Sequence, residues 1–229
     1  MKKILLVSMI VLVSARTFAQ ETYARPDIPG ELMIDLGLNY LTEISSDLTQ
    51  RGWNSKSLGL YYTKRRPLSQ KFVFNYGVGM GFEKLDFGTS QTIIQSGEEL
   101  VIDDFPFDAS GAPIQKNRLA ISYVDVPLEM RFYPRGTASG EGLFLSVGGI
   151  GGLRLSSHIK WKYSEEGSDR VQKISGNFDL NRVRYGYQLR FGYRGTHLFF
   201  KHYLSNLFDN ELDDTNPRLF SVGINFSGF

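Results

Sequence analysis

A strict alternation of apolar and polar residues is the feature that most constrains this chain, and it is clearest in YVDVPLEMRFY, residues 123–133. Successive side chains of a strand point to opposite faces. One face therefore carries Val124, Val126, Leu128, Met130 and Phe132, and the other carries Tyr123, Asp125, Pro127, Glu129 and Arg131. This pattern fits a soluble sheet with its apolar face toward a core, or a membrane barrel with its apolar face toward lipid.

The same alternation recurs through the chain, whereas no helical stripe is sustained. We count eight strands, at 31–41, about 55–65, 71–84, 123–133, 142–156, 182–194, 197–206 and 218–229. The seventh is ambiguous in its facing. Short links at 66–70, 134–141 and 194–196 alternate with long polar links at 42–54, 88–116, 161–170 and 206–217. Short turns at one end and long loops at the other are typical of transmembrane barrels.

The number of aromatic rings decides between the two directions of facing. The apolar faces together hold Phe72, Phe74, Tyr76, Phe82, Phe132, Tyr185, Tyr187, Phe191, Tyr193, Phe220 and Phe226. An eight-stranded barrel has an interior just wide enough for ordinary side chains, so these rings are expected outside, against lipid. The sequence predicts an all-β, eight-stranded antiparallel transmembrane β-barrel over 31–229, with extended outer hairpins turning at Gly97 and near Gly167. A soluble two-sheet sandwich stays open as an alternative.

The first 19 residues have the form of a Sec signal peptide, with Lys2 and Lys3 before an apolar run from Ile4 to Val13. We expect cleavage after Ala19, followed by a periplasmic segment over 20–30. Removing Lys2, Lys3 and Arg16 leaves 23 of the 26 basic residues against 24 acidic ones. A nearly neutral chain gives no reason to expect nucleic-acid binding, and zero cysteines exclude disulfides and thiolate chemistry.

Charged residues on the polar faces are expected to meet inside the barrel. They are Asp35, Glu83, Asp125, Glu129, Arg131, Arg154, Arg182, Arg184 and Arg190. Buried charges are tolerated when they are paired and hydrogen-bonded, so we interpret the set as a salt-bridge network that fills the lumen. A small-ligand site or a proton path is the alternative.

Other motifs give little evidence for chemistry. Gly77, Gly79 and Gly81 recur on one face of a strand with no helix after them, so they are not a nucleotide loop. Asp209, Glu211 and Asp213 lack the turn glycine and the closing glutamate of a calcium loop. A loose divalent site in this outer loop stays open, but we predict no metal and no cofactor.

One outer loop carries a candidate contact surface for a glycan, a lipid head group or a protein. It consists of Lys160, Trp161, Lys162 and Tyr163.

The signal end TFAQ, the strand YVDVPLEMRFYP, the glycine-rich fifth strand and the stretch KHYLSNLFDN resemble the PorT-type outer-membrane β-barrel domain proteins. The resemblance covers residues 23–229 and implies outer-membrane residence in a Gram-negative bacterium. It also suggests an accessory role in a surface or secretion assembly, although fold alone does not establish a role. The terminal Phe229 resembles the signal that barrel-assembly machinery reads.

We therefore expect a non-enzymatic structural or interaction protein, in contact with outer-membrane lipid and lipopolysaccharide and with a protein partner that the sequence does not name. Two alternatives stay open, a small-solute pore and an enzyme similar to the lipid A deacylases. The enzyme would use His202, Ser205 and Asn206, but a spacing of three places His202 and Ser205 on opposite faces of a strand unless a bulge intervenes.

Overall fold

The computed structural model describes residues 30–44, 48–88, 91–96, 99–104, 114–135, 142–165, 168–211 and 214–228. The expected signal peptide and most of the periplasmic segment lie outside these residues, as do Gly97, Gly167, Asp213 and Phe229. Within the described residues, no helix is long and apolar enough to cross a membrane.

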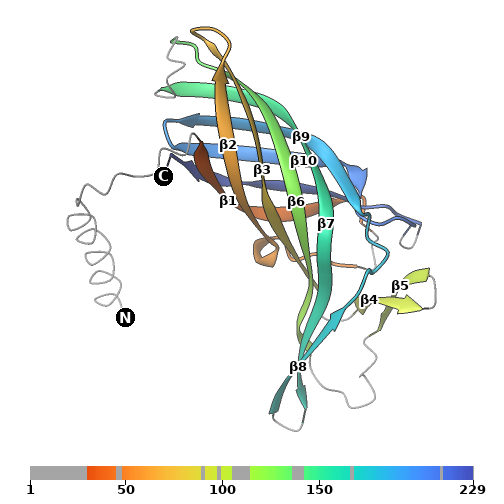
Figure 1. Ribbon diagram of the computed structural model, residues 1–229. Helices are drawn as coiled ribbons and strands as arrows, with labels where there is room; N and C mark the ends of the chain where they lie inside the picture. The colour runs from red at the N-terminus through yellow and green to blue at the C-terminus, as the bar shows by residue number, and fades with distance from the viewer. Residues whose placement is uncertain are drawn as a thin grey trace, which may run out of the picture.

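Eight strands of the described chain pair into a closed antiparallel ring (Figure 1). They are β1 (Glu31–Thr42), β2 (Lys56–Pro67), β3 (Phe72–Phe87), β6 (Ile114–Phe132), β7 (Leu143–Glu165), β9 (Val183–Tyr193), β10 (Thr196–Asn206) and β11 (Arg218–Ser227). The first and last strands pair with each other, and β6 pairs with β7 across the other junction. Closure removes every free edge from the ring, and the predicted barrel is confirmed.

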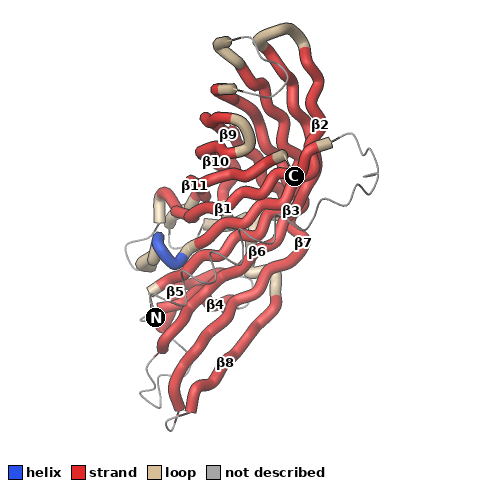
Figure 2. The backbone as a smooth tube through the Cα atoms, turned by 90° about the vertical axis from the view of Figure 1, so that its left-hand side faces the viewer, coloured by secondary structure: helices blue, strands red, loops and turns tan. Residues whose placement is uncertain are grey.

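Several strands are longer than the sequence pattern predicted, and they continue beyond the ring at the long-loop end (Figure 2). There β8 (Ser168–Ser175) pairs with the distal part of β7, and β4 (Gln91–Ser96) pairs with β5 (Glu99–Asp104) in a separate hairpin. A short 3₁₀ helix, η1 (Gly52–Asn54), lies in the first long connection. The two expected hairpins are thus present, and one of them extends the wall of the barrel itself.

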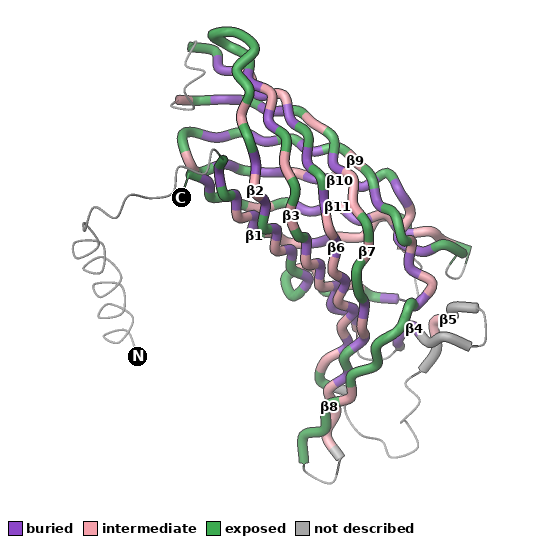
Figure 3. Tube along the Cα trace, in the orientation of Figure 1, coloured by how far each residue is buried: buried purple, intermediate pink, exposed green. Residues whose placement is uncertain are grey.

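Burial alternates along the strands in the sense expected for a membrane barrel (Figure 3). The outward apolar side chains are widely exposed, for example Leu145 at 55% and Leu198 at 60%, whereas the inward Asp125 and Arg190 are at most 1% exposed. A soluble fold would bury the first pair and expose the second. The soluble alternative is therefore wrong, and the outward placement of the aromatic rings is confirmed for Phe72, Tyr76, Tyr185, Tyr187, Phe191, Tyr193 and Phe226.

The long-loop end of the interior is closed by an apolar core. Its buried members come from the wall and from the connecting segments: Leu48, Leu85, Phe87, Ile93, Leu119, Ile121, Tyr123, Ile150, Ile159, Trp161, Phe178, Leu180, Tyr203, Leu207, Phe208 and Leu219. We call this cluster the apolar cap. The inward faces of β3, β6 and β7 thus change from polar to apolar toward the outer end, because there they pack against folded connections.

Candidate functional site in the barrel lumen

Four acids and four bases lie on the inward faces of five strands, and none of them is more than 4% exposed. They are Asp35 on β1, Glu83 on β3, Asp125, Glu129 and Arg131 on β6, Arg184 and Arg190 on β9, and Lys201 on β10. The set balances in formal charge. We call it the lumen network. Alternation places each residue inward, while closure of the ring brings together strands far apart in the sequence.

Arg190 is the centre of the half of the network nearer the short turns. Its two Nη atoms donate to the two Asp35 oxygens at 2.8 and 2.9 Å, and its Nε donates to Glu129 at 2.7 Å. Lys201 Nζ adds a second cation 2.7 Å from Asp35, and the Asn225 amide donates to the same carboxylate at 2.5 Å. One guanidinium thus joins β9 to β1 and β6 across the lumen.

Glu129 collects further donors at the same level of the lumen. The Ser146 hydroxyl donates to it at 3.1 Å and the Gln188 amide at 3.2 Å, and Arg131 Nε lies 3.4 Å away. Arg131 in turn donates to the Asn75 amide oxygen, in the amide orientation that satisfies both groups, and lies over the Phe144 ring. Nearly every acceptor of the carboxylate is occupied, which is what a buried charge requires.

Arg184 forms the second half of the network, next to the apolar cap. It binds Asp125 through Nε at 3.0 Å and Nη2 at 2.7 Å, and Nη1 donates to Glu83 at 3.1 Å. Its guanidinium lies between two aromatic rings, 3.7 Å from the centroid of Tyr123 and 4.4 Å from that of Tyr203. Paired charge and cation–π contacts together offset the loss of hydration.

Tyr61 joins the two halves. Its hydroxyl donates to Asp125 at 3.2 Å and accepts from Lys201 Nζ at 3.0 Å. A cavity beside Arg184 has a volume of about 10 Å³, which is room for about one water. The network therefore fills this level of the lumen with fixed, compensated charges.

Seven of the nine charged residues predicted for the lumen meet there, and Arg154 and Arg182 do not. Arg182 is exposed and precedes β9. Arg154 is turned to the outer rim, where its Nη1 donates to the Asn177 carbonyl at 2.8 Å and to Ser157 at 3.2 Å. Both predictions fail because the polar face of a strand continues past the level of the network.

Lys201 was not predicted for the lumen. It lies in the strand whose facing was ambiguous, because Phe199, Lys201 and Tyr203 all point inward and so mix apolar and charged groups on one face. The opposite face, with Leu198 and Leu204 exposed at 60% and 46%, is the lipid side. A signal for the inward facing of Lys201 did exist. Its partners on the neighbouring strands, Gln188 and Ser221, are polar and both face the lumen.

The candidate loop surface is not assembled as predicted. Trp161 is 4% exposed, belongs to the apolar cap and donates its Nε1–H to Thr92 at 3.1 Å. Lys162 forms an ion pair with Asp169 at 2.6 Å, and hydrogen bonding from Lys162 lowers the pKa of the exposed Asp169 carboxyl. Lys160 is exposed and Tyr163 half-buried. The prediction of an exposed Trp161 is wrong because the β4–β5 hairpin packs over it.

We expect Trp161→Phe to loosen the β4–β5 hairpin with little change in the barrel. The substitution removes the Trp161–Thr92 hydrogen bond, a contribution of about 1 kcal/mol, while it keeps an aromatic ring in the apolar cap. Limited proteolysis of the protein in membranes would show faster cleavage in the hairpin. The control is Trp53→Phe, since Trp53 is 83% exposed in η1. Equal cleavage rates in both variants would contradict this role of Trp161.

The geometry does not bring the deacylase-like residues into a catalytic arrangement. His202 faces outward, and its Nδ1 lies 3.2 Å from the Tyr187 hydroxyl. Ser205 is 8% exposed on the inward face and accepts the Tyr185 N–H at 3.2 Å. A bulge does interrupt the β10–β11 pairing between His202 and Asn206, but it leaves the two side chains with different partners on opposite faces.

Metal ligands are not clustered in the part of the chain that the structure describes, where no group of three or more His, Asp or Glu residues could hold an ion. Asp209 and Glu211 of the acidic outer loop belong to this part, but their third member, Asp213, does not.

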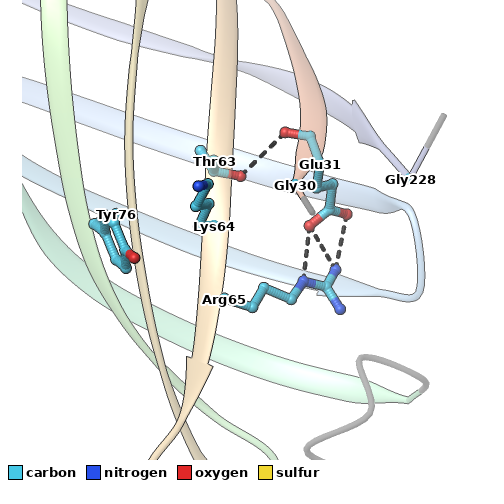
Figure 4. A pocket seen from close by; sticks show the side chains of 7 residues that line it. All are labelled: Gly30, Glu31, Thr63, Lys64, Arg65, Tyr76 and Gly228. Atoms are coloured by element: carbon cyan, nitrogen blue, oxygen red, sulfur yellow. Dashed lines mark hydrogen bonds and ion pairs between the residues drawn. The ribbon is translucent and has the colours of Figure 1, made fainter. Parts of the chain in front are cut away.

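A pocket of about 550 Å³ opens at the short-turn end beside the beginning of β1 and the end of β2 (Figure 4). Its main charged feature is a bidentate pair in which Arg65 Nε and Nη2 donate to the two Glu31 oxygens, both at 2.8 Å. Glu31 and Arg65 compensate each other, which leaves Lys64 as the remaining charged side chain of the lining.

Comparison with protein-family profiles agrees with this architecture. The profile of the outer membrane protein beta-barrel domain family matches residues 18–210. No curated protein matches the chain. Solved structures similar to it include a mutant of Rh. blastica porin, with 12% identity over 87% of this chain and 98% of the porin chain and a TM-score of 0.19. A triple mutant of Rhodopseudomonas blastica porin has 11% identity, the same coverage and the same TM-score. The chain, with its closed ring, lipid-facing apolar surface and charged interior, belongs to the outer membrane protein beta-barrel domain family.

Proposed function

We propose that this outer-membrane protein is a closed, non-enzymatic barrel that anchors an outward-projecting β-sheet for contact with other components of the cell surface. The observation that carries the proposal is the lumen network, in which Arg190 joins Asp35 on β1 to Glu129 on β6 across the interior. A pore needs a hydrated path, whereas here the lumen is crossed by side chains and covered by the apolar cap.

The outward sheet supports the interaction role. The distal part of β7 with β8 extends past the ring. Among the described residues no strand pairs with the outer edge of β8, whose side chains are mostly exposed (Figure 3). An uncovered strand edge is a template for pairing with another chain. The resemblance to PorT-type proteins adds the proposal that the partner belongs to a surface or secretion assembly of a Gram-negative bacterium. The cleaved signal peptide and recognition of the terminal aromatic by assembly machinery belong to the same proposal.

Two measurements test this function. Purified protein in planar bilayers is expected to give no conductance steps. Regular steps would contradict the closed barrel and show that the protein is a pore. Mild detergent extraction is expected to recover a stoichiometric companion, which a variant with residues 162–172 replaced by a short turn would lose. Repeated recovery of the barrel alone, or a companion that the shortened variant retains, would contradict an interaction through β8.

The enzyme alternative has a separate test. We expect Ser205→Ala to leave the lipid A profile of the cell unchanged, because Ser205 and His202 face opposite sides of β10. A changed profile with normal amounts of protein would support catalysis instead.

A further inference from the structure

Two lysines face each other on the outer wall of the barrel. Lys56 at the start of β2 is directly opposite Lys84 on β3 in the antiparallel register. Both belong to the outward set of their strands, in phase with Leu58 and Phe82, and Lys56 is exposed while Lys84 is partly exposed. Side chains directly opposite in such a pair lie about 4.5–5.5 Å apart at Cβ, and like charges there destabilise the sheet.

Acids among the described residues compensate this pair only in part. The salt bridges of that part of the chain include neither Lys56 nor Lys84, although Asp86, one outward position further along β3, acts on Lys84 through space. Asp86 is 1% exposed and is held by Arg118 Nε at 2.6 Å. Because Asp86 is already paired with Arg118, the two neighbouring lysines are only partly compensated, and an anionic ligand between them would stabilise the arrangement.

An apolar groove of about 760 Å³ adjoins the two lysines on the same wall. It runs over β11, β1, β2 and β3, and the side chains of Leu36, Leu38, Leu58, Phe82, Val222 and Ile224 line it together with Lys56 and Lys84. The groove is thus hydrocarbon-like over most of its length and cationic at one end. That distribution matches an amphiphile with an anionic head and apolar chains.

The position of the lysines indicates that their ligand lies in the outer leaflet of the membrane. They lie at the end of the barrel that carries the long connections, which is the outer end in transmembrane barrels. The wall above them stays basic, since the next row of outward positions pairs Arg118 with Lys160, and Lys160 with Lys173. On β2 and β3 the next outward row toward the short turns is apolar, with Leu58 opposite Phe82, and on β1 and β11 the lysine row itself is apolar, with Leu38 opposite Val222. The lysines therefore mark the boundary between hydrocarbon and head groups.

We propose that the outer wall binds a phosphate-bearing glycolipid of the outer leaflet, with a phosphate between Lys56 and Lys84 and acyl chains along the groove. The ammonium groups supply charge-assisted hydrogen bonds to phosphate oxygens, and the leucines and Phe82 contact the chains. The site rests on the outer-membrane location of the family and is independent of the proposed interaction role of β8.

The test uses the full-length protein in a non-ionic detergent, with a chelator present and bis-phosphorylated lipid A as the probe. Binding is measured by native mass spectrometry and by the rise in unfolding temperature. We expect the double variant Lys56→Gln/Lys84→Gln to bind the probe at least about tenfold more weakly than the parent, because charge-assisted hydrogen bonds are lost. Without the probe, the variant is expected to be as stable as the parent or more stable, since the repulsion is gone.

The matched control is Lys64→Gln/Arg66→Gln, which removes two exposed outward cations at the other end of the same strand. This control is expected to bind the probe as tightly as the parent. The proposal is overturned if the Lys56/Lys84 variant binds unchanged, or if the control loses as much affinity. It is equally overturned if dephosphorylated lipid A or phosphatidylglycerol binds as tightly as the probe, since the phosphate or the glycolipid would then not be recognised.

Discussion

Arg190→Met is expected to lower the free energy of unfolding by about 3–5 kcal/mol, because it leaves buried carboxylates without their main partner. Asp35 is then paired through Lys201 alone and Glu129 through Arg131, at distances of 2.7 and 3.4 Å. Methionine keeps much of the volume, so the effect measures charge and hydrogen bonding rather than a cavity. The measurement is the urea midpoint and the temperature at which the folded, fast-migrating form is lost in detergent gels.

Arg182→Met serves as the control for Arg190→Met. Arg182 precedes the same strand and is exposed, so its substitution is expected to change the free energy of unfolding by no more than about 0.5 kcal/mol. A second comparison adds Asp35→Asn to Arg190→Met, and we expect it to recover part of the loss since one uncompensated charge is removed. If Arg190→Met were as stable as the Arg182 variant, the lumen network would not be a determinant of the fold.

Gly148→Ala is expected to destabilise the barrel by about 1–3 kcal/mol. Gly148 is an inward position of β7, where an added Cβ would collide with the Leu128 carbonyl oxygen and lie 2.8 Å from Glu129 Cα. Both are backbone atoms of the paired strand β6, so no side chain can turn aside to make room. The expected result is a lower urea midpoint with unchanged strand content by circular dichroism.

Gly149→Ala is the matched control for Gly148→Ala. A Cβ at this adjacent, exposed position would find only the Gly186 carbonyl oxygen, at 3.8 Å, which is ordinary van der Waals contact. Both substitutions reduce the flexibility of the unfolded chain equally, so the difference between them isolates crowding between β7 and β6. Equal stability of the two variants would show that β7 and β6 can separate without cost.

Prediction from the amino-acid sequence was most reliable where one periodic signal decided the outcome. Alternation located all eight strands of the ring, and the volume of the aromatic rings established that the apolar faces point outward. It was least reliable at the ends of strands and in the loops. Arg154 and Arg182 share the polar phase of their strands but lie outside the network. Trp161 is a residue type that is common in contact surfaces, but here a hairpin from another connection buries it.

The sequence by itself determined the class of fold, the side that faces lipid and most of the charges inside, because side-chain facing follows the strand period of two without knowledge of any partner. Only the tertiary structure decided which charges meet. Arg190 contacts Asp35 and Glu129, which are 155 and 61 residues away, and that contact exists because the ring closes at a particular register. The same register places Lys56 opposite Lys84. Pairing between distant strands is a property of the closed sheet, so no single strand carries the signal for it.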